Sequence, residues 1–377
     1  MLHHTFNVSD EGSIDTVTRM LEQFIPLFSS DKFNICCDET FDLGKGKNKE
    51  LLKQVGSGRL YMDFLKKVIA LVKKYDKEVL FWGDIILKHP EYIKEIPEGV
   101  TCLNWGYDAE VTEDSTRILA ESGLKLYVCP SVQGWSRLIN SFDIAYNNIR
   151  KMATYGKKYG AEGVLNTDWG DFGHVQLLAG TVPGIIYGAS LSWNPEDRQS
   201  RQQMDKAIAL LEYGDSREEL MEILLELSEC QSFGWEQFNL WRERELHEKE
   251  RVEGWLNSIK ALDPAVVSES YEKALRLERQ IIKKSREVYP WKLQDMQEFA
   301  NAARGIALIA AAFMPIRKYS LGFKDTPMLM EPMVLAEELE LWLEGYMPLW
   351  RRRNKESELY RIREAVYELT KFLRSIH

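Results

Sequence analysis

The sequence predicts a partial parallel (β/α) barrel of the TIM type, followed by an all-helical domain. Up to about residue 196, short apolar runs alternate with segments whose apolar residues recur every three or four positions. The runs are apolar at consecutive positions, as in strands buried on both faces of a parallel sheet. From residue 197 onward only helical patterns remain. We therefore expect a barrel domain over residues 1–196 and a helical domain over residues 197–377.

Five apolar runs have the length of a buried strand and are bounded by charged residues, glycine or proline. These runs cover residues 33–37, 79–82, 100–103, 124–128 and 163–165. Helical patterns precede the first two runs, because apolar residues recur at helical spacing between Ile14 and Phe28 and between Leu60 and Val72. A full barrel needs eight strands, so the sequence accounts for part of one.

The second region predicts a bundle of helices with charged outer faces. The helical segments are expected near residues 200–230, 266–288, 292–315, 331–347 and 355–376, with glycine and proline at the breaks. Its tryptophans lie in helical patterns and are expected in the core: Trp235, Trp241, Trp255, Trp342 and Trp350. The short basic run Arg351 to Arg353 is expected on a solvated face.

Composition excludes several classes of function. The 377 residues include 49 Lys and Arg against 58 Asp and Glu, a net charge of −9, without a basic tract for nucleic acid or an anionic membrane. No apolar run approaches the ~18 residues of a membrane span. No signal peptide is visible, and five cysteines without C-x-x-C spacing indicate a reduced, cytoplasmic chain. Cys36 and Cys37 are expected as buried residues of a strand, and no residue cluster calls for a metal or an organic cofactor.

Polar and aromatic residues suited to a binding site follow the expected strands. They are Asp38-Glu39, Trp82-Gly83-Asp84, Asn104-Trp105-Gly106-Tyr107, Cys129-Pro130 with Trp135 beyond it, and Asp168-Trp169-Gly170-Asp171. In parallel barrels the chemistry takes place at the carboxyl ends of the strands. Tryptophan rings stack on the apolar faces of sugars, while carboxylates and asparagine bind hydroxyl groups. This combination indicates a carbohydrate pocket.

The Asp38-Glu39 pair has two interpretations. It can be a solvated loop or the N-cap of a following helix, which is the commoner role of such a dipeptide. It can also be a catalytic pair, because two adjacent carboxylates repel and the pKa of one is raised, as a general acid requires. Its place directly after an apolar strand strengthens the second interpretation and leaves the first open.

The residues from Phe33 to Thr40, with Leu43-Gly44 after them, resemble the His/Asn-x-Gly/Cys-x-Asp-Glu signature of glycoside hydrolase family 20, the β-N-acetylhexosaminidases. The motifs around Trp82, Trp105 and Trp169 follow in the order of that family's later strands. The resemblance spans about residues 15–195, and the helical tail resembles the C-terminal domain of a bacterial branch of exo-acting N-acetylglucosaminidases. In the family the acid pair ends strand four, so the resemblance implies that the five expected strands correspond to strands four to eight of the barrel.

The resemblance implies a hydrolase that releases terminal β-linked N-acetylglucosamine or N-acetylgalactosamine by a substrate-assisted retaining mechanism. The 2-acetamido oxygen of the sugar attacks the anomeric carbon and gives an oxazolinium intermediate. Glu39 would be the general acid and then the base, and Asp38 would hold the acetamido N–H and stabilise its developing charge. The residues implied to bind the sugar are Trp82, Trp105, Trp135, Trp169 and Asp171.

Two departures from the family pattern bear on this expectation. Trp135 and Arg137 stand where the family usually has a Tyr, whose hydroxyl holds the acetamido oxygen, and then an Asp. Tyr107 and Tyr127 are both candidates for that hydroxyl. Strands one to three have no counterpart, so either the chain is a fragment, or another copy in a homo-oligomer, or another chain, covers the gap. The rival interpretations are a non-catalytic sugar-binding module and a helical docking module on a barrel scaffold.

Overall fold

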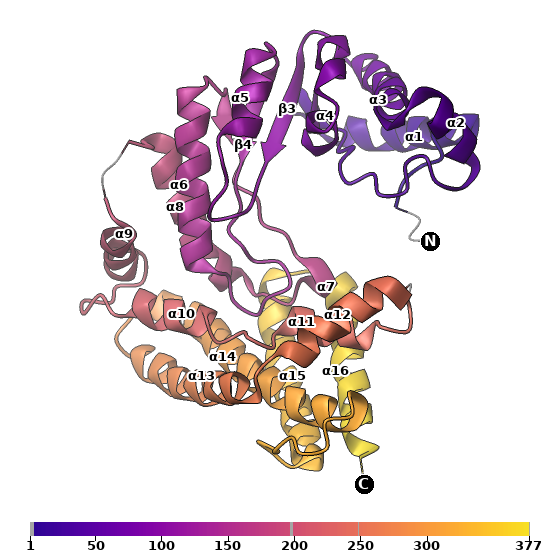
Figure 1. Cartoon of the computed structure of the whole chain (residues 1–377). Helices are drawn as coiled ribbons and strands as arrows, with labels where there is room; N and C mark the ends of the chain where they lie inside the picture. Colours follow the sequence, from indigo (N-terminus) through magenta and orange to yellow (C-terminus); the bar gives the residue numbers. More distant parts are fainter. Residues whose placement is uncertain (1–3, 197–198, 248, 377) are drawn as a thin grey trace. The chain divides into compact units, whose positions relative to one another are not determined.

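The computed structural model describes residues 4–196, 199–247 and 249–376 (Figure 1). Contacts within the chain divide it into two compact units. The sheet unit comprises Met1–Pro130 and Arg150–Asn166, and the helical unit comprises Ser131–Ile149 and Thr167–His377. This division differs from the boundary after residue 196 that the sequence predicts, because two segments before that residue group with the tail helices.

The sheet unit is built on five parallel strands that lie in sequential order. The strands are β1 (Lys32–Asn34), β2 (Glu78–Trp82), β3 (Val100–Trp105), β4 (Lys125–Cys129) and β5 (Gly163–Val164). In the parallel register Phe33 lies opposite Val79, and Cys102 lies opposite Leu126. Each strand falls on one of the five apolar runs. The architecture is a half-barrel with a helical domain, so the predicted fold class is confirmed.

Helices cover one face of this sheet. They are α1 (Glu11–Phe24), α3 (Ser57–Lys73), α4 (Asp84–Leu87), α5 (Asp114–Glu121) and α6 (Phe142–Lys158), of which α6 has residues in both units. The short helix α2 (Lys49–Val55) packs on α3. Leu65 and Val72 on α3 pack in one cluster with Val79 and Phe81 of β2. Fully burying such a side chain stabilises the fold by about 1.5–3 kcal/mol, so this cluster anchors the strands.

The opposite face of the sheet carries a smaller apolar cluster. Successive side chains of a strand point to opposite faces, so Leu80 and Trp82 lie on the face away from Val79 and Phe81. The cluster consists of Leu80, Trp82, Leu103 and Cys129, with Trp105 and Tyr127 packed against it. This face is the one that would line a closed barrel.

The helical unit holds the remaining helices. They are α7 (Asp171–His174), α8 (Leu178–Trp193), α9 (Arg201–Ala207), α10 (Leu220–Ser228), α11 (Trp235–Arg242), α12 (Lys249–Ala261), α13 (Pro264–Lys284), α14 (Leu293–Pro315), α15 (Pro332–Arg353) and α16 (Leu359–Arg374). Pairs α13–α14 and α15–α16 pack side by side. The segment Pro290–Ser320 is long and apolar enough to cross a membrane, but 83% of its apolar window is buried inside the structure, as in a core helix.

Hydrogen bonds explain why the segment 131–149 and the chain after residue 166 group with the tail helices. Arg137 Nη2 donates to the Ser228 carbonyl oxygen at 2.6 Å, at the C-terminal end of α10 where a positive charge is favourable. The Ala179 N–H of α8 donates to Glu298 Oε2 of α14 at 2.9 Å. The two bonds fix segments on either side of α6 to the tail.

Candidate active site

The loop after β1 carries the predicted acid pair. β1 ends at Asn34, before the predicted end at residue 37, because Cys36 and Cys37 have φ values of 59° and 69°. Strands require negative φ, so the prediction that these two cysteines belong to the strand is wrong. Glu39 is also left-handed, with a φ of 48°. Such non-glycine residues cost about 1–3 kcal/mol each and persist only where the surroundings hold them.

Hydrogen bonds from three elements hold this loop. The Cys36 N–H donates to Asn34 Oδ1 at 2.9 Å, and the Trp82 N–H donates to the Cys36 carbonyl oxygen at 3.0 Å. The Tyr61 hydroxyl on α3 donates to the Cys37 carbonyl oxygen at 3.0 Å. The backbone leading to the acid pair is therefore fixed before any ligand binds, as an active site requires. Asn34 is the first residue of the signature that ends in Asp38-Glu39, whereas Tyr61 belongs to no motif that marks it in the sequence.

Asp84 brings a third carboxylate to the pair. It is the first residue of α4, and its Oδ2 accepts the Glu39 N–H at 3.1 Å. Its Oδ1 is buried and has no hydrogen-bond partner in the part of the chain that the structure describes. Burial raises the pKa of Asp84, and the charge of Asp38 raises it further. Asp84 is therefore an acid with a raised pKa directly beside the Asp38-Glu39 pair.

We expect Asp84→Asn to raise the melting temperature at about pH 7 and to change it little at about pH 3. An acid with a raised pKa binds more protons in the folded state than in the unfolded state, so wild-type stability falls as pH rises past the ordinary aspartate pKa of ~3.9. Asparagine has no such charge and keeps an oxygen that accepts the Glu39 N–H. Thermal unfolding across this pH range measures the effect, and a difference that does not grow with pH would contradict it.

The tryptophans of the sheet unit lie on the face opposite the helices. Trp82 is 5% exposed and packs with Leu103 and Cys129, so little of its ring is open to a ligand. Trp105 is half-buried and stacks on Tyr107, with ring centroids 5.0 Å apart. Trp105 thus offers more surface for a sugar than Trp82, and a tyrosine hydroxyl lies beside it.

The other predicted sugar-binding residues belong to the helical unit. Trp135 is half-buried, and Trp169 is 37% exposed. Asp171 is the first residue of α7, where partial burial raises its pKa. The preceding acid, Asp168, accepts a hydrogen bond from Thr181 Oγ1 at 2.7 Å. A role of these residues in binding sugar stays a prediction from the sequence.

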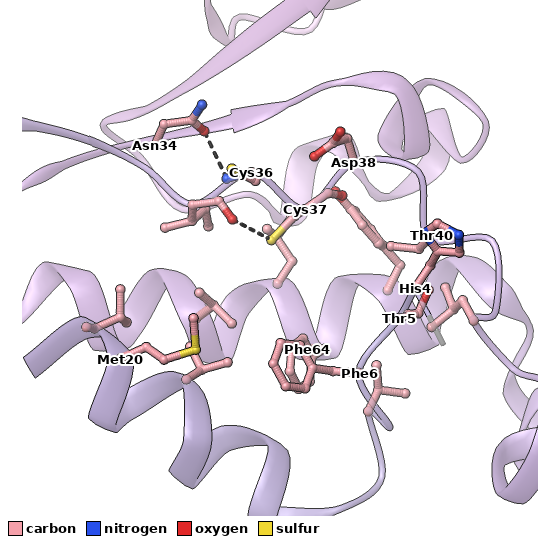
Figure 2. Close-up of a pocket in the computed structure, with 18 of the residues that line it drawn as sticks. His4, Thr5, Phe6, Met20, Asn34, Cys36, Cys37, Asp38, Thr40 and Phe64 are labelled. Atoms are coloured by element: carbon pink, nitrogen blue, oxygen red, sulfur yellow. Dashed lines mark hydrogen bonds between the residues drawn. The ribbon is translucent and has the colours of Figure 1, made fainter. Parts of the chain in front are cut away.

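A largely apolar cavity of about 440 Å³ lies beside the loop, between α1, α3 and β1 (Figure 2). Met20, Phe64 and Cys37 are among the residues that line it. Burial raises the pKa of Cys37 to about 12, and its Sγ donates to the Ile35 carbonyl oxygen at 3.3 Å. In Figure 2 the carboxylate of Asp38 lies on the side of the loop away from Met20 and Phe64. Asp38 is nevertheless among the residues that line the cavity, so the cavity extends to the acid pair.

Cysteine and acidic residues form no metal centre in the described parts of the chain, where no group of three or more His, Cys, Asp or Glu residues could hold an ion. All five cysteines are free. Cys102, Cys129 and Cys230 are buried, whereas Cys36, which was expected to be buried, is exposed. The left-handed backbone at Cys36 breaks the alternation of the strand at this residue, although its carbonyl oxygen still accepts the Trp82 N–H.

Comparison with known proteins finds no matching family model and no matching curated protein. The chitobiase of glycoside hydrolase family 20 from Flavobacterium johnsoniae is similar in structure, with 14% identity and a TM-score of 0.43 over 98% of this chain and 60% of that chain. An O-GlcNAc hydrolase from Thermobaculum terrenum shows 10% identity and a TM-score of 0.46 over 97% of this chain and 76% of that chain. This chain therefore spans 60% of the length of the chitobiase. Similarity at this level carries no argument about the site or its chemistry.

Proposed function

We propose that this chain is a β-N-acetylhexosaminidase that releases terminal β-linked N-acetylglucosamine or N-acetylgalactosamine by substrate-assisted retention. The observation that carries the proposal is the Asp38-Glu39 pair, which lies on a fixed loop at the carboxyl end of β1. Catalytic groups of parallel barrels project from this end of the strands. The resemblance of Phe33 to Thr40 to the family 20 signature supports the same chemistry.

Each acid of the pair has a distinct part in the proposed reaction. Glu39 is exposed, so its carboxyl group can approach the glycosidic oxygen and give it a proton as the bond to the anomeric carbon breaks. The acetamido oxygen of the sugar attacks the same carbon and forms the oxazolinium ion. Asp38 accepts the acetamido N–H and stabilises the positive charge. Glu39 then takes a proton from the water that opens the ring, which returns it to its starting state.

Release of a fluorophore from an aryl N-acetyl-β-glucosaminide tests the activity. We expect turnover to slow progressively as fluorine replaces hydrogen on the acetamido methyl group, because fluorine withdraws electrons from the nucleophilic oxygen. A rate that is insensitive to fluorine would contradict substrate assistance. A folded chain that binds N-acetylglucosamine without releasing the fluorophore would contradict the proposed activity and support a non-catalytic sugar-binding module.

Asp38→Asn is expected to lower kcat about 100-fold, because an amide cannot stabilise the charge that develops on the acetamido group. Asp42→Asn is a matched control on the same loop, since Asp42 Oδ2 accepts the His4 N–H at 3.0 Å and has no part in the reaction. The control should keep its turnover. Far-UV circular dichroism checks that both variants are folded, and equal kcat values for the two would remove Asp38 from the mechanism.

A further inference from the structure

Asp84 is placed by backbone that has little freedom. Gly83 precedes α4, and its N–H donates to the Leu103 carbonyl oxygen at 2.9 Å, which ties the turn to β3. A Cβ atom at Gly83 would lie 2.7 Å from Cys102 Sγ, which is closer than such atoms approach, so glycine is required there. Asp84 therefore projects from a turn that is anchored to the neighbouring strand.

The hydrogen bond from the Glu39 N–H to Asp84 Oδ2 joins residues that are 45 positions apart in the chain. The N–H belongs to the peptide unit between Asp38 and Glu39. A single bond at this point consequently fixes the backbone from which both carboxylates project. It also holds Glu39 at a φ of 48°, which a glutamate does not favour.

Asp84 lowers the stability of the folded state, so its presence is not explained by packing alone. Its Oδ1 is buried without a hydrogen-bond partner among the described residues, and a buried polar atom of this kind destabilises the folded state. The nearby charge of Asp38 adds repulsion. Groups that cost stability in this way are typical of functional sites, where their geometry is needed.

We propose that Asp84 is a positioning residue for the acid pair. By accepting the Glu39 N–H, it holds the Asp38-Glu39 peptide unit in the orientation in which Glu39 reaches the leaving oxygen and Asp38 meets the acetamido group. The effect on turnover rests on the proposed hydrolase function, whereas the effect on the loop does not. The role requires an oxygen acceptor at this place and not a negative charge.

Two variants separate the acceptor from the charge. Asp84→Ala removes the acceptor, and Asp84→Asn replaces the carboxylate with an amide that keeps an oxygen. Hydrogen exchange measured on peptides that cover residues 36–42 should rise about tenfold at the Glu39 amide in Asp84→Ala. In Asp84→Asn it should stay within about threefold of the wild type.

Turnover of the aryl N-acetyl-β-glucosaminide should follow the same order. Asp84→Ala is expected to lower kcat about 30-fold with KM within about threefold, because misplaced acids slow the reaction more than they weaken binding. Asp84→Asn should recover most of that loss. Ile85→Ala is the matched control, since Ile85 is the next residue of α4 and is buried in the same apolar cluster as Leu65 and Val79. It should lower the melting temperature and leave kcat and the exchange of Glu39 near the wild-type values.

Three results would overturn the proposal. The first is wild-type exchange at Glu39 in Asp84→Ala, and the second is failure of Asp84→Asn to restore the protection that alanine loses. The third is an equal effect of Ile85→Ala, which would mean that general loosening of α4 moves the loop. If the wild-type chain shows no turnover, the proposed hydrolase function fails, and the exchange measurements still decide whether Asp84 holds the acid pair.

Discussion

Glu39→Gln will slow hydrolysis of an N-acetyl-β-glucosaminide that has a poor leaving group about 1,000-fold. Glutamine keeps the shape of the side chain but has no carboxyl proton to give to the departing oxygen. A substrate with an activated aryl leaving group needs little protonation, so its first step should lose much less. Rates for a series of aryl glycosides with leaving groups of increasing acidity measure this difference.

The second step gives an independent check on Glu39. Without a base, water opens the oxazolinium ion slowly, and added azide should accelerate the variant on the activated substrate, because azide needs no deprotonation. Glu50→Gln on α2 is the control, since Glu50 Oε1 accepts from Lys53 at 2.8 Å on an exposed surface. An equal loss for good and poor leaving groups, with no response to azide, would exclude Glu39 as the acid and base.

Arg353→Met is expected to lower the free energy of unfolding by about 3 kcal/mol. The Arg353 guanidinium at the end of α15 contacts Asp295 and, at 3.3 Å, Glu298 of α14. The Glu298 side chain is 1% exposed and that of Asp295 is 3% exposed. Methionine removes this positive partner from both buried acids; Asp295 keeps Lys292 at 3.3 Å, whereas Glu298 has no other ion pair among the described residues, and an unpaired buried charge is costly. Urea unfolding followed by circular dichroism measures the loss.

Arg352→Met is the control for this prediction. Arg352 is exposed and donates to Gln297 Oε1 at 2.9 Å, so its loss should cost less than about 0.5 kcal/mol. The cost of Arg353→Met should also shrink at acidic pH. Burial already raises the pKa of Glu298, so this acid takes up a proton early as pH falls and then no longer needs a countercharge. Equal costs for the two arginine variants at neutral pH would contradict the buried network.

Apolar runs predicted the fold well because a strand that is buried on both faces is apolar at consecutive positions. All five strands fall on such runs, and Trp235, Trp241, Trp342 and Trp350 are buried as expected. No bounds were predicted for α11 and α12, although Trp235, Trp241 and Trp255 were expected in helical patterns, because the sequence between Trp235 and Ala261 is rich in charge. Trp255 is only half-buried, so its expected place in the core is wrong. The run Arg351 to Arg353 is exposed as expected, and the sequence did not reveal that Arg353 also contacts two buried acids of α14.

The acid pair could be placed from the sequence, but the groups that hold it could not. An apolar strand before Asp38-Glu39 fixes which end of the sheet the pair occupies. The left-handed backbone at Cys36 depends on distant partners, and nothing in a run of apolar residues reveals a positive φ. Tyr61 and Asp84 lie far from the pair in the chain, so only the fold brings them to it.

The left-handed turn at Cys36 also bears on how the chain behaves when it is concentrated. β1 is the outer strand of an open sheet, and an outer strand is a place where a second molecule can add its own strand and begin to aggregate. Here the strand lasts only from Lys32 to Asn34, starts with a charged lysine and is ended by the turn. The backbone that holds the acids in place therefore also leaves a second molecule very little strand on which to grow.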